Sequence, residues 1–282
     1  IRDLMISLKR NSKMELVPAP GKRVRASSIH VPGQNEDFKL SRGKFNDFLT
    51  CPRCFYMDRV LGFASPGTPG WTLNETTDNL LKKEFDLCRE DQTPHRLCVQ
   101  NGMSHVVPFD HPDMDKWRDS LRHGLIHRFE TTNIILSGGV DDIWQDTKTK
   151  QLIVVDYKSQ AKHKQVETEA YLSDVYHEGY KVQMDFYAYL LTEMGFDVFP
   201  TSYFYVCNAD RHADGFFGEM KFYETLVPYD WSIDWIPDQV QSMVDFMNSR
   251  DVPEANPSCE NCAYARQRSR YDKQPETLDL FE

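Results

Sequence analysis

The fold of this chain is decided by three short stretches, which read GGVDDIW at 138–144, LIVVDYK at 152–158 and QMDFY at 183–187. The second stretch is rich in β-branched residues, which is typical of a buried strand. Side chains two residues apart on a strand point to the same face, so Asp156 and Lys158 are predicted to project together. A polar turn at 147–150 follows the first stretch, and a hairpin there would bring Asp141 beside Asp156.

Two carboxylates and a lysine at one place indicate a metal-dependent phosphodiesterase centre. Carboxylate oxygens are the ligands that Mg²⁺ and Mn²⁺ prefer, with water and substrate phosphate completing the shell. Lys158 would orient the nucleophile or neutralise the developing negative charge. The neighbour Asp142 should face the other way, so its replacement is expected to leave substantial activity. The alternative is a hairpin with a surface ion pair, because an Asp-x-Lys pattern is short.

In this order the three stretches resemble motif II, motif III and the Gln/Tyr motif of the RecB-like branch of the PD-(D/E)XK nucleases. The resemblance extends to LSRGKF at 40–45, CPRCFY at 51–56 and a closing Cys-x-x-Cys at 259–262, so it covers about residues 38–265. Within that branch the chain is similar to CRISPR-associated adaptation nucleases and AddB-type nuclease domains. The resemblance implies an α/β, restriction-endonuclease-like core, in which helices flank a mixed central sheet.

The resemblance also implies roles for individual residues. The expected catalytic set is Asp141, Asp156, Lys158, Gln183 and Tyr187, in which the two carboxylates bind Mg²⁺ or Mn²⁺. Gln183 and Tyr187 share one face of an amphipathic helix predicted over 174–194, and would orient the site or contact the nucleic acid.

A third metal ligand is expected from an earlier helix, predicted over 73–89. Relatives in the RecB-like branch place a His or Glu there, whereas this chain has Asp78. The alternative is that Asp78 forms only the polar edge of an amphipathic helix.

Two Cys-x-x-Cys pairs, Cys51 with Cys54 and Cys259 with Cys262, are predicted to form a second metal site. Four thiolates can enclose one tetrahedral zinc ion or hold one cubane iron-sulfur cluster. The resembling relatives carry an iron-sulfur cluster, which favours a 4Fe-4S cluster here. They place one cysteine early and three late, so the two-plus-two arrangement keeps Zn²⁺ as the alternative. Either metal would create a small lobe that joins the N- and C-terminal segments.

Composition limits the function classes. The 282 residues include seventeen Phe and five Trp, enough for one large core with a small appended lobe. The formal net charge of -10 argues against coating nucleic acid through a broad basic surface. No stretch has the pattern of a signal peptide or a membrane span, so we expect a cytoplasmic protein with no membrane partner. In that compartment disulfides are not expected among the seven cysteines, and metal binding is the better explanation of the paired ones.

We predict an N-terminal arm at 1–37, a nuclease domain at 38–265 and a C-terminal tail at 266–282. The chain starts with Ile, so we expect the N-terminus to be trimmed. Further helices are predicted over 112–129 and 231–248 from their apolar spacing. The tail ends in TLDLF at 277–281, which resembles a sliding-clamp-binding peptide. The alternative is that this run folds back onto the protein's own surface.

The leading functional hypothesis is a metal-dependent DNA nuclease that acts on single strands or duplex ends in repair, recombination or CRISPR/defence processing. The chain has no P-loop of the Gly-x-x-x-x-Gly-Lys-[Ser/Thr] type, so unwinding would require a helicase or a CRISPR or repair partner. The alternative from another class is a catalytically silent nucleic-acid-binding or scaffold subunit. A redox or zinc-ribbon interaction module would explain the cysteines only.

Overall fold

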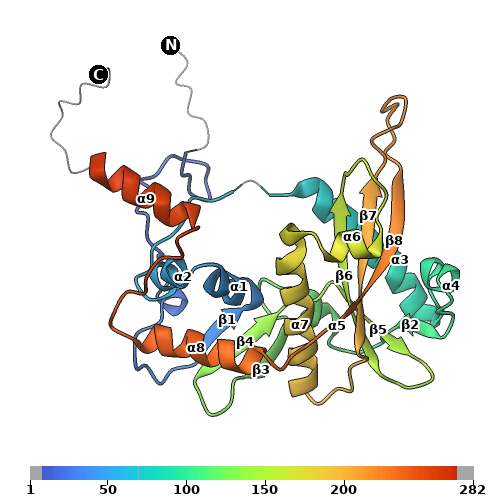
Figure 1. Ribbon diagram of the computed structural model, residues 1–282, viewed down its shortest axis with the longest axis horizontal. Coiled ribbons are helices and arrows are strands. Elements are labelled where there is room, and N and C mark those ends of the chain that lie inside the picture. The colour runs from blue at the N-terminus through green and yellow to red at the C-terminus, as the bar shows by residue number, and fades with distance from the viewer. Residues whose placement is uncertain (1–7, 69, 272–282) are drawn as a thin grey trace.

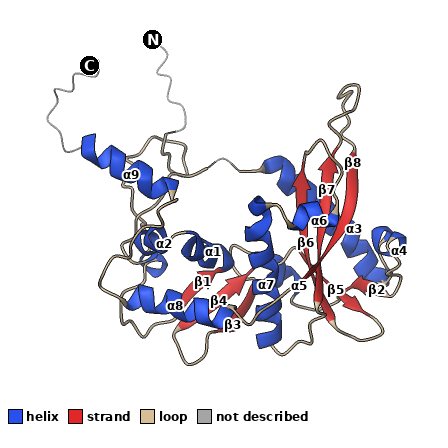
Figure 2. Cartoon of the chain, viewed as in Figure 1, coloured by secondary structure: helices blue, strands red, loops and turns tan. Residues whose placement is uncertain are grey.

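Two β-sheets and the helices around them make up the computed structural model, which describes residues 8–68 and 70–271 (Figures 1 and 2). The larger sheet has the order β2 (Val106–Pro108), β5 (Asp142–Asp146), β6 (Leu152–Gln160), β7 (Thr201–Ala209), β8 (Phe222–Asp230). The smaller sheet has the order β1 (Phe38–Ser41), β4 (Ile134–Gly138), β3 (Leu125–Arg128). In the described part of the chain, no helix is long and apolar enough to cross a bilayer.

Both sheets are mixed, and the larger one is the mixed central sheet that was predicted. Strands β6 and β7 run parallel, and so do β1 and β4, whereas the other neighbours are antiparallel. The register of β5 and β6 pairs Asp142 with Val155. Continued by one residue, this register sets Asp141 opposite Asp156, which is the arrangement that the hairpin prediction required.

Helices cover the two faces of β6, because its apolar side chains alternate between two cores. Leu152 and Val154 belong to the core around α7 (Glu178–Glu193), whereas Ile153 and Val155 belong to the core around α3 (Thr72–Asp91). Asp156 and Lys158 continue the alternation of Leu152 and Val154, so they face α7. Shorter elements complete this half of the fold: α4 (Arg96–Gln100), α5 (Met114–Arg118), α6 (Thr168–Leu172) and η2 (Val175–His177).

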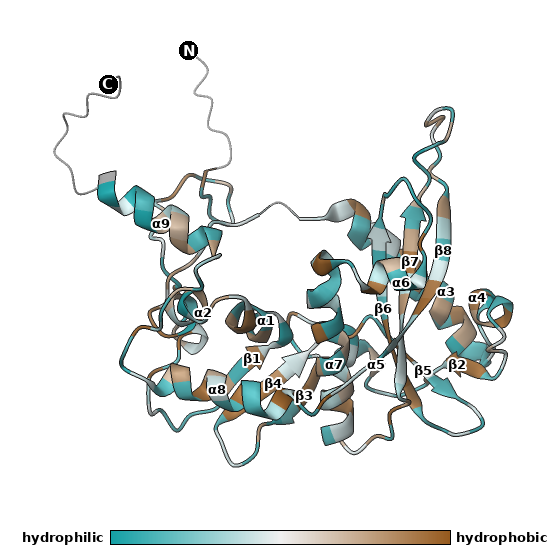
Figure 3. Ribbon diagram, in the orientation of Figure 1, coloured by the Kyte–Doolittle hydropathy of each residue, from teal (hydrophilic) through white to brown (hydrophobic). Residues whose placement is uncertain are grey.

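The remaining helices lie beside the smaller sheet. Helices α1 (Arg42–Thr50) and α8 (Ile236–Asn248) pack on one another and on α7, and α2 (Pro52–Arg59) packs on α1 and α8. Helix α9 (Glu260–Tyr271) follows α8 and is mostly polar, which Figure 3 shows as teal ribbon. Helix α9, which ends the described chain, lies on the same side of the molecule as α2 (Figure 1).

Two predicted helices differ from the structure. The segment 112–129 contains only the short helix α5, a turn and then strand β3. Gly124 enters β3 with φ +80°, and a Cβ there would lie 2.7 Å from the carbonyl oxygen of Gly138, so the backbones meet too closely for a helix to continue. The helix predicted over 231–248 begins only at Ile236, where Pro237 suits the first turn.

The predicted arm and tail each contain a short helical segment in the structure. Residues 8–37 are largely irregular, with one short 3-10 helix, η1 (Ala26–Ser28). The predicted start of the tail at residue 266 falls inside helix α9. The clamp-like run at 277–281 lies outside the described residues.

Candidate active site

Asp156 is the centre of the candidate site. Its side chain is fully buried on β6, where Oδ1 accepts a hydrogen bond of 2.6 Å from Nε2 of Gln183 on α7. Oδ2 forms an ion pair with Lys158, two residues along the same strand. Burial raises the pKa of Asp156 to about 7, because desolvation outweighs the opposing charge of Lys158, and the nearby Asp141 carboxylate adds to the rise.

Asp141 is fixed next to Asp156 by the backbone. Its Oδ2 accepts a hydrogen bond of 2.8 Å from the N–H of Tyr157, the residue between Asp156 and Lys158. Strand register predicted this meeting of two carboxylates and one lysine, and all three lie together in the structure.

Gln183 and Tyr187 lie one helical turn apart on α7, and Nε2 of Gln183 is 3.1 Å from the Tyr187 hydroxyl. Both side chains are buried. Gly138 ends β4 against Tyr187, and a Cβ at that position would lie 2.6 Å from the tyrosine ring. The glycine thus allows α7 to approach the sheet closely enough for Gln183 to reach Asp156.

Asp78 reaches the same region from α3. Its Oδ2 accepts a hydrogen bond of 2.8 Å from Lys82, whose Nζ is also 3.9 Å from Oδ1 of Asp141. The second oxygen, Oδ1, is buried and has no hydrogen-bond partner. Burial and then the Asp141 charge raise the pKa of Asp78. Sequence reasoning missed Lys82, since a lysine four residues after an aspartate is typical of any helix surface.

The donor set fits a hard divalent cation, which prefers carboxylate oxygens. The orphaned Oδ1 of Asp78 supports the fit, because a buried carboxylate oxygen without a partner is costly. The three carboxylates are spread more widely than a closed ligand cage: among the described residues, only the cysteines bring three or more candidate ligand atoms within 4.8 Å of one another. The ammonium of Lys82 lies between Asp78 and Asp141.

Behind this site, Asp142 faces the opposite core, as strand alternation requires, but it is fully buried and not a neutral position. Its Oδ1 accepts a hydrogen bond of 2.8 Å from Arg118 and pairs with Arg89. Its Oδ2 accepts one of 2.9 Å from the Tyr157 hydroxyl. Asp142 pairs with two largely buried guanidinium groups, so its replacement by Ala is expected to destabilise the fold. That the variant keeps substantial activity stays a prediction.

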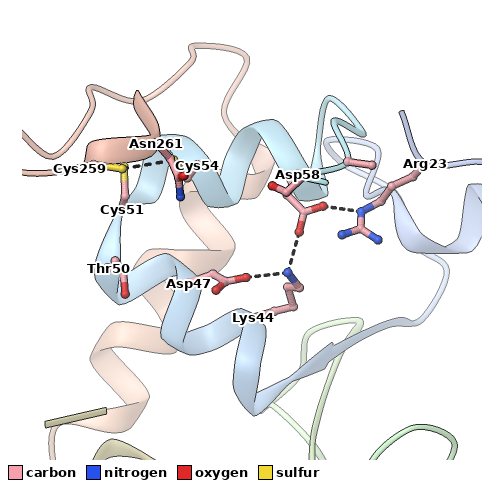
Figure 4. Close-up of a pocket in the computed structure, with 11 residues that line it drawn as sticks. Arg23, Lys44, Asp47, Thr50, Cys51, Cys54, Asp58, Cys259 and Asn261 are labelled. Carbon is pink, nitrogen blue, oxygen red and sulfur yellow. Dashed lines mark hydrogen bonds and ion pairs between the residues drawn. The ribbon is translucent and has the colours of Figure 1, made fainter. Parts of the chain in front are cut away.

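The four paired cysteines also meet. The Sγ atom of Cys54 is 3.5 Å from that of Cys259 and 3.4 Å from that of Cys262, and Cys51 and Cys262 are 3.8 Å apart. Figure 4 shows Cys51, Cys54 and Cys259 at the edge of a cavity of about 280 Å³. Burial opposes ionisation of Cys51, but hydrogen bonds led by the backbone of Cys54 lower its pKa to about 7. The group has the composition of a metal site.

A family model described as the PD-(D/E)XK nuclease superfamily matches residues 72–267, more than half of the chain. The chain belongs to the PD-(D/E)XK nuclease superfamily. The match contains every residue of the carboxylate site and the second cysteine pair, whereas Cys51 and Cys54 precede it.

A structural comparison finds similarity to a crystal structure named as a putative exonuclease from Eubacterium rectale. The two chains are 12% identical with a TM-score of 0.39, over 92% of this chain and 96% of the other. No curated protein matches this PD-(D/E)XK nuclease.

Proposed function

We propose that this nuclease is a Mg²⁺- or Mn²⁺-dependent deoxyribonuclease of the RecB-like branch, which hydrolyses phosphodiester bonds in DNA repair, recombination or CRISPR/defence processing. The observation that supports it best is the meeting of Asp141, Asp156 and Lys158 beside the orphaned carboxylate oxygen of Asp78. Buried acids that lack enough partners are costly for folding, and such costs are characteristic of functional sites.

Asp141, Asp156 and Asp78 are the residues that would hold the divalent cation. When bound, such an ion lowers the pKa of a coordinated water and stabilises charge on a phosphodiester. Asp156 must give up its proton to serve as a ligand, and the neighbouring Lys158 favours the charged carboxylate.

Lys158 has a second role in this proposal. Its Nζ lies 4.7 Å from the centre of the Tyr180 ring, so the ammonium is held between a carboxylate and an aromatic face. From there it orients the attacking water or neutralises the developing charge on the phosphate. Gln183 and Tyr187 position the Asp156 carboxylate from α7.

The proposed substrate is DNA, as single strands or duplex ends, and the proposed setting is the cytoplasm. A helicase or a CRISPR or repair partner would supply unwinding.

The TLDLF run at 277–281 is proposed to bind a sliding clamp, and a peptide of residues 271–282 titrated against a bacterial clamp tests it. Binding no tighter than that of a peptide with Leu280→Ala and Phe281→Ala would exclude this partner.

The central experiment compares substrates and metals. Purified protein is incubated with end-labelled single-stranded DNA, duplex DNA and RNA of one sequence, in EDTA, Mg²⁺ or Mn²⁺. We expect DNA cleavage only with a divalent metal, and none by an Asp156→Asn variant. DNA that is bound but left intact in every metal would favour the silent scaffold subunit. Preferential cleavage of RNA would reject the DNA assignment while retaining a nuclease.

A further inference from the structure

We propose that Cys51, Cys54, Cys259 and Cys262 bind a single tetrahedral Zn²⁺ ion, and not the iron-sulfur cluster that the resemblance to cluster-bearing nucleases implies. The inference concerns a site separate from the carboxylates, so it stands or falls independently of the proposed nuclease activity.

The spacing of the sulfur atoms supports one ion. A tetrahedral zinc ion with bonds of about 2.3 Å to sulfur places its four ligands roughly 3.8 Å from one another. Three of the Sγ–Sγ distances in the group are 3.4, 3.5 and 3.8 Å. All four sulfur atoms lie within 4.8 Å of one another. The cysteines thus converge on one point at the spacing that a single small ion requires.

A cubane cluster requires a different spacing. In a 4Fe-4S cluster each cysteine sulfur binds a different iron, and the inorganic core of iron and sulfide lies between the four ligands. The ligand sulfurs must therefore stand much farther apart than around one ion. Sulfur atoms in near contact leave no room between them for that core, so the cysteine group as folded does not fit the cluster.

The number of ligands indicates a structural role. Four protein ligands complete the tetrahedral shell of zinc, whereas catalytic zinc sites keep one position open for water or substrate. The four cysteines come from both ends of the described chain: Cys51 lies between α1 and α2, Cys54 in the first turn of α2, and Cys259 and Cys262 at the start of α9.

In the described part of the chain, helix α9 is a polar helix on the surface. None of residues 260–270 is buried, and the second half of the helix contains three arginines, Arg266, Arg268 and Arg270. Two hydrogen bonds connect the segment before α9 to the α1–α2 corner. Arg53 donates one of 3.1 Å to the carbonyl of Pro253, and Asn256 donates one of 3.1 Å to the carbonyl of Thr50. A polar helix gains little by burial, so a metal bond is the main attachment of α9 to the α1–α2 corner.

The test is metal analysis of the full chain, expressed with both iron and zinc in the medium and purified under anaerobic conditions. We expect about one zinc per chain, negligible iron and acid-labile sulfide, and no absorption in the visible range. Replacement of the zinc by Co²⁺ should give the strong visible bands of tetrahedral thiolate coordination. Brown protein with about four irons per chain and labile sulfide would overturn the proposal, and so would protein with no metal.

Two serine variants make the test specific. Cys259→Ser should lose the bound zinc and make α9 sensitive to limited proteolysis, whereas Cys88→Ser, which changes a cysteine outside the group, should retain both. Unchanged zinc content in Cys259→Ser would overturn the assignment of the ligands. If Cys259→Ser does not fold, Cys262→His provides a second test, because zinc accepts a histidine in this position and a cubane rarely does.

Discussion

The side-chain amide of Gln183 donates a hydrogen bond of 2.6 Å to the carboxylate of Asp156, and this bond connects helix α7 to strand β6. Two residues that are 27 positions apart in the chain are thereby held in the arrangement that the site needs. Because Asp156 is buried, the loss of a donor to its charged form affects both its orientation and its pKa.

Gln183→Leu is therefore expected to slow DNA cleavage by roughly 10- to 100-fold, the equivalent of one hydrogen bond to a charged group. It should also move the pH midpoint of the reaction upwards, since the carboxylate loses a partner that favours its ionised form. Rate against pH is the measurement, with Gln241→Leu on the exposed face of α8 as the control. A slower reaction with an unchanged midpoint would indicate only general damage to the fold.

The raised pKa of Asp156 also predicts how stability depends on pH. The pKa of Asp156 in the folded protein, about 7, lies above the ordinary value of 3.8. Between these two pH values the folded protein keeps the proton on Asp156, whereas the unfolded chain has lost it. The contribution of this group to stability is fully present below about pH 4 and is lost as the pH rises through 7. In metal-free protein, urea denaturation between pH 5 and pH 8 should show this loss, and Asp156→Asn should remove it. An unchanged pH profile in the variant would contradict the assignment.

Lys82 is predicted to compete with the divalent metal. Its ammonium lies 2.8 Å from Asp78 and 3.9 Å from Asp141, so it already neutralises two of the three proposed ligands. Lys82→Met should bind Mn²⁺ at least several-fold more tightly by calorimetry, whereas the exposed neighbour Lys83→Met should match the parent. Weaker binding by Lys82→Met would show instead that the lysine supports the metal site.

The adjacent aspartates of the hairpin should separate stability from activity. Asp142→Ala removes the fully buried one of the two carboxylates, Asp142 and Asp86, that pair with Arg89 and Arg118, and should cost about 3–5 kcal/mol in urea denaturation. Asp141→Ala, on a side chain that is 25% exposed, should cost much less and yet abolish cleavage. Equal losses of stability in the two variants would contradict this division.

The β5–β6 hairpin and helix α7 could be predicted from the sequence because their signals are local. Apolar residues at 152–155 mark the strand, and the turn at 147–150 sets the register that brings Asp141 to Asp156. Gln183 and Tyr187 are four residues apart, which specifies one face of any helix.

The smaller sheet could not be predicted in this way. Strand β1 pairs with β4 across almost a hundred residues, from Phe38 to Ile134, and each strand is only four or five residues long. Short strands in long-range pairs have no local periodicity to reveal them. The partners of Asp142 could not be predicted either, because Arg89 and Arg118 are 53 and 24 residues away from it in the sequence.

Lys158 is proposed to act on the phosphodiester during cleavage, and single-turnover cleavage of labelled DNA in Mn²⁺ by Lys158→Met tests this role most directly. Lys148→Met, at the exposed turn of the same hairpin, is the matched control. We predict that Lys158→Met retains the fold and metal binding but cleaves roughly 10²- to 10³-fold more slowly, while Lys148→Met matches the parent. Cleavage by Lys158→Met at the parent rate would contradict the account.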